Sequence, residues 1–114
     1  MAEYAYAVLK DKQNKALFLK FLTNSSPACD CSGHNDASIV HDIGIVASRD
    51  PVAIDQASVD LVNRMPANHE YCIKNSKAPG EDKFRDVYPN IDWNVKLEHA
   101  ESIGLGSRTY ELVT

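Results

Sequence analysis

The sequence has no long hydrophobic run, no basic cluster and only three cysteines among its 114 residues. Its apolar runs are far shorter than the roughly 20 residues that a transmembrane helix needs. Lysine and arginine are scattered and the net charge is −4, whereas a nucleic-acid-binding module needs clustered basic residues to neutralise phosphates. The start, MAEYAYAVLK, lacks the basic region and apolar core of a secretory signal. We therefore expect neither a membrane nor a nucleic acid as partner.

The cysteine content disfavours a disulfide framework. Three is an odd number, and Cys29 and Cys31 are too close in sequence to favour a mutual bridge. We therefore expect a reducing cytoplasm as the location. The length and the hydrophobic content of 44% fit one small globular domain over residues 1–114.

The hydrophobic pattern predicts an α/β fold. Helices are expected over residues 2–10, 50–64, 80–87 and 92–103, and strands over residues 16–23, 41–48 and 107–114. Apolar residues on both faces of segment 16–23 predict a strand that is mostly covered on both sides. We expect a small sheet of three or four strands, mostly parallel or mixed, with helices packed on it.

A long polar connection, residues 24–38, separates the first two predicted strands. Irregular loops of this length are uncommon in compact domains unless they have a function. The strand-to-helix turn that follows is a place where open α/β sheets commonly bind ligands. We therefore expect the functional residues to lie between residues 29 and 60.

The connection carries candidate metal ligands. Thiolates and neutral imidazoles bind zinc and iron, so we consider the set Cys29, Cys31, His34 and Cys72. The C-x-C spacing differs from the C-x₂₋₄-C pairs of structural zinc sites, and a second such pair is missing. A complete metal site, shared or incomplete ligation, and inert buried thiols all stay open at this point.

The helix expected from Asp50 carries a further candidate, Asp55. Asp50 followed by Pro51 is a strong helix start, because the carboxylate caps free N–H groups. Helical periodicity places Asp55 inside the apolar arc that should be covered. An unpaired buried carboxylate is costly, so Asp55 should find a cation, hydrogen bonds or a metal. It is either a ligand or general base near the cysteines, or a residue at the edge of the arc that the helix dipole favours.

Three segments together carry a resemblance to a known family: FLTNSSPACDCSGHND, DIGIVASRDPVAIDQASVDLVN and IGLGSRTYELV. On these segments the chain resembles the C-terminal part of the uncharacterised iron–sulfur centre proteins, also called domain of unknown function 362. Cys29 and Cys31 match the CDC stretch of that family, and Asp50 and Asp55 match its D-P-V-A-x-D signature. The resemblance implies an α/β domain, a cytoplasmic protein and a link to iron–sulfur electron transfer. The chain lacks the C-x₂-C-x₂-C-x₃-C run of ferredoxins, so cluster binding does not carry over on that basis.

Members of the family are typically longer, so the resemblance implies a C-terminal fragment or a truncated member. The first functional hypothesis is a metal- or iron–sulfur-associated domain of an electron-transfer protein, holding a cluster or a single Zn or Fe ion. Its candidate ligands are Cys29, Cys31, His34, Asp55 and Cys72. The alternatives are an enzyme domain that binds a small anionic or metal-bound substrate at the Asp50/Asp55 helix, and a structural domain that packs on upstream sequence. The implied partners are an upstream ferredoxin-like region, a separate redox protein or a second copy of the chain.

Overall fold

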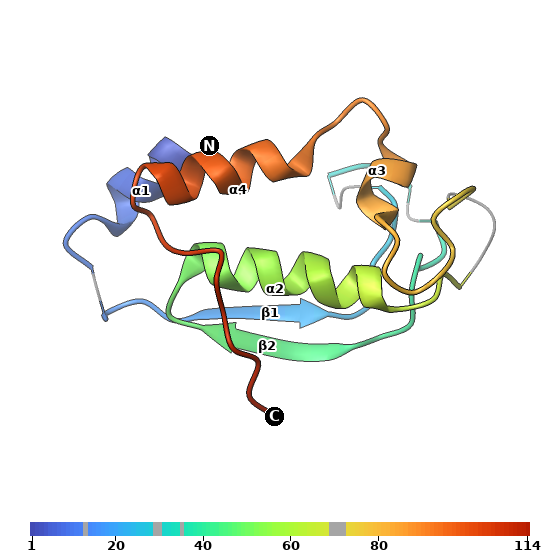
Figure 1. The fold of residues 1–114 in the computed structure, drawn as a ribbon, viewed down its shortest axis with the longest axis horizontal. Helices are drawn as coiled ribbons and strands as arrows, with labels where there is room; N and C mark the ends of the chain where they lie inside the picture. The colour runs from blue at the N-terminus through green and yellow to red at the C-terminus, as the bar shows by residue number, and fades with distance from the viewer. Residues whose placement is uncertain (13, 29–30, 35, 69–72) are drawn as a thin grey trace.

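The computed structural model describes all residues except 13, 29–30, 35 and 69–72. The described residues form four helices and two strands, in the order α1 (Ala2–Leu9), β1 (Phe18–Leu22), β2 (Gly44–Ser48), α2 (Pro51–Arg64), α3 (Lys83–Val87) and α4 (Trp93–Ser102). In Figure 1, the sheet, α2 and α4 form successive layers, with α1 beside α4. The predicted helices and the first two predicted strands are confirmed, so the fold mixes helices with a sheet.

The sheet is smaller than the sequence predicts. Strand β1 pairs antiparallel with β2, with Phe18 opposite Ser48 and Leu22 opposite Gly44. In the described part of the chain these two strands make up the whole sheet, which differs from the expected three or four mostly parallel or mixed strands.

The predicted strand over residues 107–114 is wrong. Arg108 Nε donates to Gln56 Oε1 at 2.8 Å, and the Tyr110 hydroxyl donates to Asp60 Oδ2 at 2.7 Å. These side-chain bonds hold the C-terminal segment to α2, and its backbone forms no ladder with β1 or β2. The alternating pattern of the segment therefore reflects contacts with a helix rather than a place in the sheet.

Among the described residues, α2 packs on one face of the sheet, and the other face carries exposed side chains. On β1, Leu22 is buried, whereas Leu19 and Phe21 are 57% and 65% exposed, and Ile45 on β2 is 60% exposed. Successive strand residues point to opposite faces, and α2 packs on the face that carries Leu22. The prediction that the first strand is covered on both sides is therefore wrong.

The start of α2 is fixed by the carboxylate of Asp50, as predicted. Oδ1 of Asp50 accepts from the backbone N–H groups of Val52 at 2.8 Å and Ala53 at 3.0 Å. Oδ2 accepts from the backbone N–H of Ser107 at 2.8 Å. One side chain thus caps the helix and also holds the beginning of the C-terminal segment.

Two glycines shape the turn after α4. Gly104 has a φ of +78°, a left-handed conformation that ends the helix, and the backbone N–H of Leu105 donates to the carbonyl of Ala100 at 3.0 Å. At Gly106 a Cβ would overlap the carboxylate of Asp50. The C-terminal segment can approach the N-terminus of α2 closely because residue 106 has no side chain.

Two apolar clusters hold the layers together. One joins α1, α2 and α4 through Ala2, Val52, Leu97 and Ala100. The other joins the C-terminal half of α2 to the neighbouring connections through Ile39, Val40, Val62 and Ile73. Full burial of a Val, Leu or Ile side chain stabilises a fold by about 1.5–3 kcal/mol, so each cluster fixes the position of α2.

A buried lysine connects α2 to the segment before α3. Lys83 is fully buried, and its Nζ donates to the carbonyl oxygens of Asn63 at 3.0 Å, Ala78 at 3.1 Å and Glu81 at 3.4 Å. Burial lowers the pKa of Lys83, because the charged form is the one that loses hydration. The three carbonyl acceptors offset part of that loss.

The close approach at Gly106 gives a test of this architecture. We expect Gly106→Ala to lower the free energy of unfolding by about 1–3 kcal/mol, because the new methyl group must displace the capping carboxylate of Asp50. The matched control is Gly33→Ala, where an added Cβ meets nothing within 4 Å. Urea unfolding of both variants measures the difference, and equal stabilities would contradict the proposed contact.

Candidate functional site

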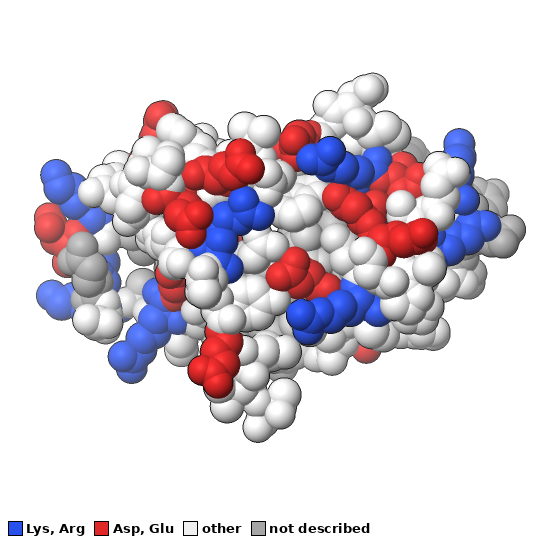
Figure 2. Space-filling model, in the orientation of Figure 1, with Lys and Arg blue, Asp and Glu red and all other residues white. Residues whose placement is uncertain are grey.

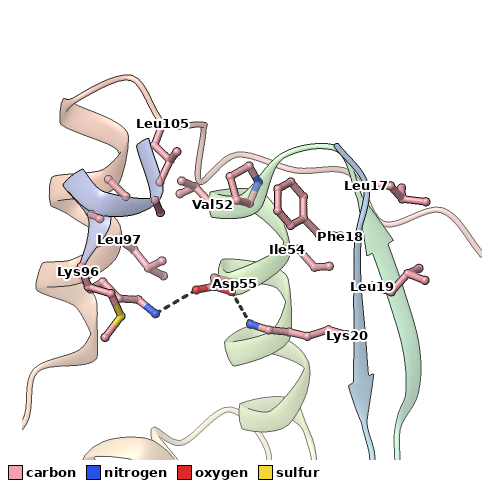
Figure 3. Close-up of a pocket in the computed structure, with 15 residues that line it drawn as sticks. Leu17, Phe18, Leu19, Lys20, Val52, Ile54, Asp55, Lys96, Leu97 and Leu105 are labelled. Carbon is pink, nitrogen blue, oxygen red and sulfur yellow. Dashed lines mark hydrogen bonds and ion pairs between the residues drawn. The ribbon is translucent and has the colours of Figure 1, made fainter. Parts of the chain in front are cut away.

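The side chain of Asp55 lies between β1 and α4 and pairs with one lysine from each. Oδ1 accepts from Nζ of Lys20 on β1, and Oδ2 accepts from Nζ of Lys96 on α4 at 3.0 Å. Figure 3 shows the two ammonium groups reaching the carboxylate from opposite sides. The expectation that this carboxylate finds a cation is confirmed. We call Lys20, Asp55 and Lys96 the charged triad.

Local structure explains why the two lysines meet at α2. Lys20 interrupts an apolar strand, and strand alternation places it on the same face as the buried Leu22, the face that α2 covers. Lys96 directly precedes the buried Leu97 on α4. Sequence analysis missed both lysines, although a signal was present: a lysine on the covered strand face and an aspartate on the covered helix arc each need a partner.

Asp55 is held in its ionised form. Partial burial alone would raise the pKa of its carboxyl, but hydrogen bonds from Lys20 and Lys96 and their positive charges outweigh burial, so the pKa lies below its usual 3.8. Two ammonium groups around one carboxylate leave the triad with one excess positive charge. Because an ammonium carries three N–H donors, each lysine has donors beyond the one that Asp55 takes.

Two cavities meet at the charged triad. The first, of about 450 Å³, is walled by α1, β1, α2 and α4, and we call it the α1-side cavity. The second, of about 580 Å³, is lined by Phe84 of α3 and Trp93 of α4 among others, and we call it the α3-side cavity. Lys20, Asp55 and Lys96 line both. Each volume lies within the range of about 300–1,000 Å³ that is typical of small-molecule sites.

The candidate metal ligands lie elsewhere or outside the described residues. Cys29 and Cys72 fall on residues that the structure does not describe, whereas Cys31 and His34 are exposed in the connection between β1 and β2. His34 lines a hollow separate from the two cavities of Asp55. Within the described ranges, no group of three or more His, Cys, Asp or Glu side chains is placed to hold a metal ion. The metal set stays a prediction.

The described neighbours of Cys72 lie against the end of the cysteine-bearing connection. The backbone N–H of Asn68 donates to the carbonyl of Ile39 at 2.8 Å, and Asn68 Nδ2 donates to the carbonyl of Ser38 at 3.3 Å. Ile73 is fully buried in the same cluster as Ile39. The segments that flank Cys72 are therefore both anchored where this connection ends.

The charged side chains on the face shown in Figure 2 are of both signs. Figure 2 shows acidic and basic side chains interspersed over this face, without a patch of one sign. In the part of the chain that the structure describes, no helix has the length and apolar content to cross a bilayer.

Comparison with known protein families gives a match over the first half of the chain. A family model described as Domain of unknown function (DUF362) matches residues 1–60. These residues include β1, β2 and the first part of α2, with Lys20 and Asp55, whereas Lys96 and the IGLGSRTYELV segment lie beyond the match. No curated protein and no solved structure matches the chain.

The lowered pKa of Asp55 predicts a pH-dependent cost for Asp55→Asn. Because the pKa is lower in the folded than in the unfolded chain, the stabilisation is fully present above pH 3.8 and is lost as pH falls through the folded value. We expect the substitution to cost about 1 kcal/mol of unfolding free energy at neutral pH and progressively less below about pH 4. Urea unfolding across this range measures the difference, and a cost independent of pH would contradict the assignment.

Proposed function

The chain belongs to the family named Domain of unknown function (DUF362), and we propose that its function is to bind a small anionic molecule at Lys20 and Lys96. The observation that carries this proposal is the convergence of two lysines, from β1 and α4, on one carboxylate between two cavities. The family description names no ligand, so the proposal depends on the chemistry of the site.

The charged triad suits an anion. Lys20 and Lys96 keep 42% and 49% of their side-chain surface exposed, so a ligand can reach both ammonium groups. Asp55 holds the two groups close together without cancelling their combined charge. A carboxylate or phosphate oxygen accepts the lysine N–H groups that Asp55 does not use, and such charge-assisted hydrogen bonds are about twice as strong as neutral ones.

The alternative hypothesis from the sequence placed a small anionic or metal-bound substrate at the helix that carries Asp50 and Asp55. Of these two aspartates, Asp55 belongs to the site proposed here and Asp50 does not. The carboxylate of Asp50 accepts three backbone N–H groups, from Val52, Ala53 and Ser107, and its role is structural. In the proposed site, Asp55 positions the two lysines, and it is the lysines that bind the ligand.

Titration with acetate and inorganic phosphate, followed by NMR chemical shifts, tests the proposal. We expect Lys96→Met to weaken anion binding about tenfold, because one charge-assisted hydrogen bond is lost. The matched control is Lys15→Met, which removes an exposed lysine in the turn after α1. Equal affinities of the native protein and of Lys96→Met would contradict the proposal.

A metal or iron–sulfur association at the cysteine-bearing connection is a second proposal. Its candidate ligands are Cys29, Cys31, His34 and Cys72, because thiolates and neutral imidazoles bind zinc and iron. We leave Asp55 out of this ligand set, since its two oxygens already pair with lysines. Under this proposal the partner is a ferredoxin-like region or a separate redox protein, and the compartment is a reducing cytoplasm.

Metal analysis of protein prepared without oxygen tests the second proposal. We expect close to one equivalent of iron or zinc in the native chain and loss of the metal in Cys29→Ser and Cys31→Ser, because thiolates are the strongest ligands of the set. His41→Ala, which changes an exposed histidine outside the set, serves as the control. A folded protein that contains no metal would contradict this proposal.

A further inference from the structure

We infer that the ligand of the charged triad is an amphipathic carboxylate, with a single anionic head and an unbranched apolar chain that fills the α1-side cavity. The inference rests on the anion-binding function proposed above and specifies the part of the ligand that the lysines do not touch. The head group lies at Lys20 and Lys96, and the chain extends from it between α1, β1, α2 and α4.

The walls of the α1-side cavity indicate that the part of the ligand beyond its head group is apolar. Of the described residues that line the cavity, all but Lys20, Asp55 and Lys96 have apolar side chains. Figure 3 shows the charged triad at one end and apolar side chains extending away from it, among them Phe18, Val52, Ile54, Leu97 and Leu105. Polar groups placed there would lose hydration without gaining partners, so a sugar or a nucleotide fits poorly.

The charge of the site decides the character of the head group. The triad carries one excess positive charge, from two lysines and one aspartate, which a monoanionic carboxylate neutralises. A dianionic phosphate would leave one negative charge without a partner in the triad. Charge complementarity therefore favours a carboxylate.

Small side chains of α1 leave space in the cavity for the apolar chain of the ligand. Ala2 and Ala5 of α1 line the cavity, and the helix is held to α4 by the pair of Glu3 Oε1 and His99 Nε2, 3.1 Å apart. Ala5 is half-buried at the cavity, whereas Ala7 on the same helix is exposed. A larger side chain at residue 5 therefore fills the space, and the same change at residue 7 does not.

Calorimetric titration with straight-chain carboxylates from butanoate to decanoate tests the inference. We expect Kd to fall about threefold to fourfold for each added CH₂ until the cavity is full, because each buried CH₂ contributes a constant increment. Ala5→Leu should remove this dependence of Kd on the length of the carboxylate. Ala7→Leu is the matched control and should behave as the native protein does.

Lys96→Met separates the inference from the proposed function. We expect it to weaken binding of every carboxylate about tenfold without altering the dependence on chain length. If affinity falls in Lys96→Met but does not depend on the length of the carboxylate, the inference of an apolar ligand chain is refuted and the proposed anion site is supported. If affinity rises with chain length but ignores Lys96→Met, the anion site is refuted and this inference with it.

Discussion

The ion pairs of Asp55 join the three layers of the fold, because Lys20 belongs to the sheet, Asp55 to α2 and Lys96 to α4. A carboxylate on the covered arc of α2 would be costly without cations. Lys20 and Lys96 keep 42% and 49% of their side-chain surface exposed, so each lysine keeps part of its hydration while it pairs with Asp55. One aspartate thus brings side chains of all three layers into contact.

The two cavities at the charged triad are walled by residues of both apolar clusters. Val52 and Leu97 line the α1-side cavity, and Ile39 and Val62 line the α3-side cavity. Ion pairs of partly exposed groups contribute little to stability, about 0–1 kcal/mol each. A site of this kind is therefore more readily explained by binding than by folding.

The features that depend on residues close together in the sequence were predicted correctly. Asp50 followed by Pro51 marked a helix start correctly, because a capping side chain bonds N–H groups two or three residues away. The partners of Asp55 were missed because they lie 35 and 41 residues away. The segment 107–114 was misassigned for the same reason, since Gln56 and Asp60, which hold it, are distant in sequence. The metal set stays a prediction, because two of its cysteines fall outside the described residues.

The double role of Asp50 has a mechanical consequence. Its carboxylate grips the backbone of Ser107, and Asp55 stands little more than one turn further along the same helix. The C-terminal segment is thus bonded to α2 before Asp55, through Asp50, and after it, through Gln56 and Asp60. The helix that carries Asp55 is therefore held by this segment as well as by the two layers that supply the lysines.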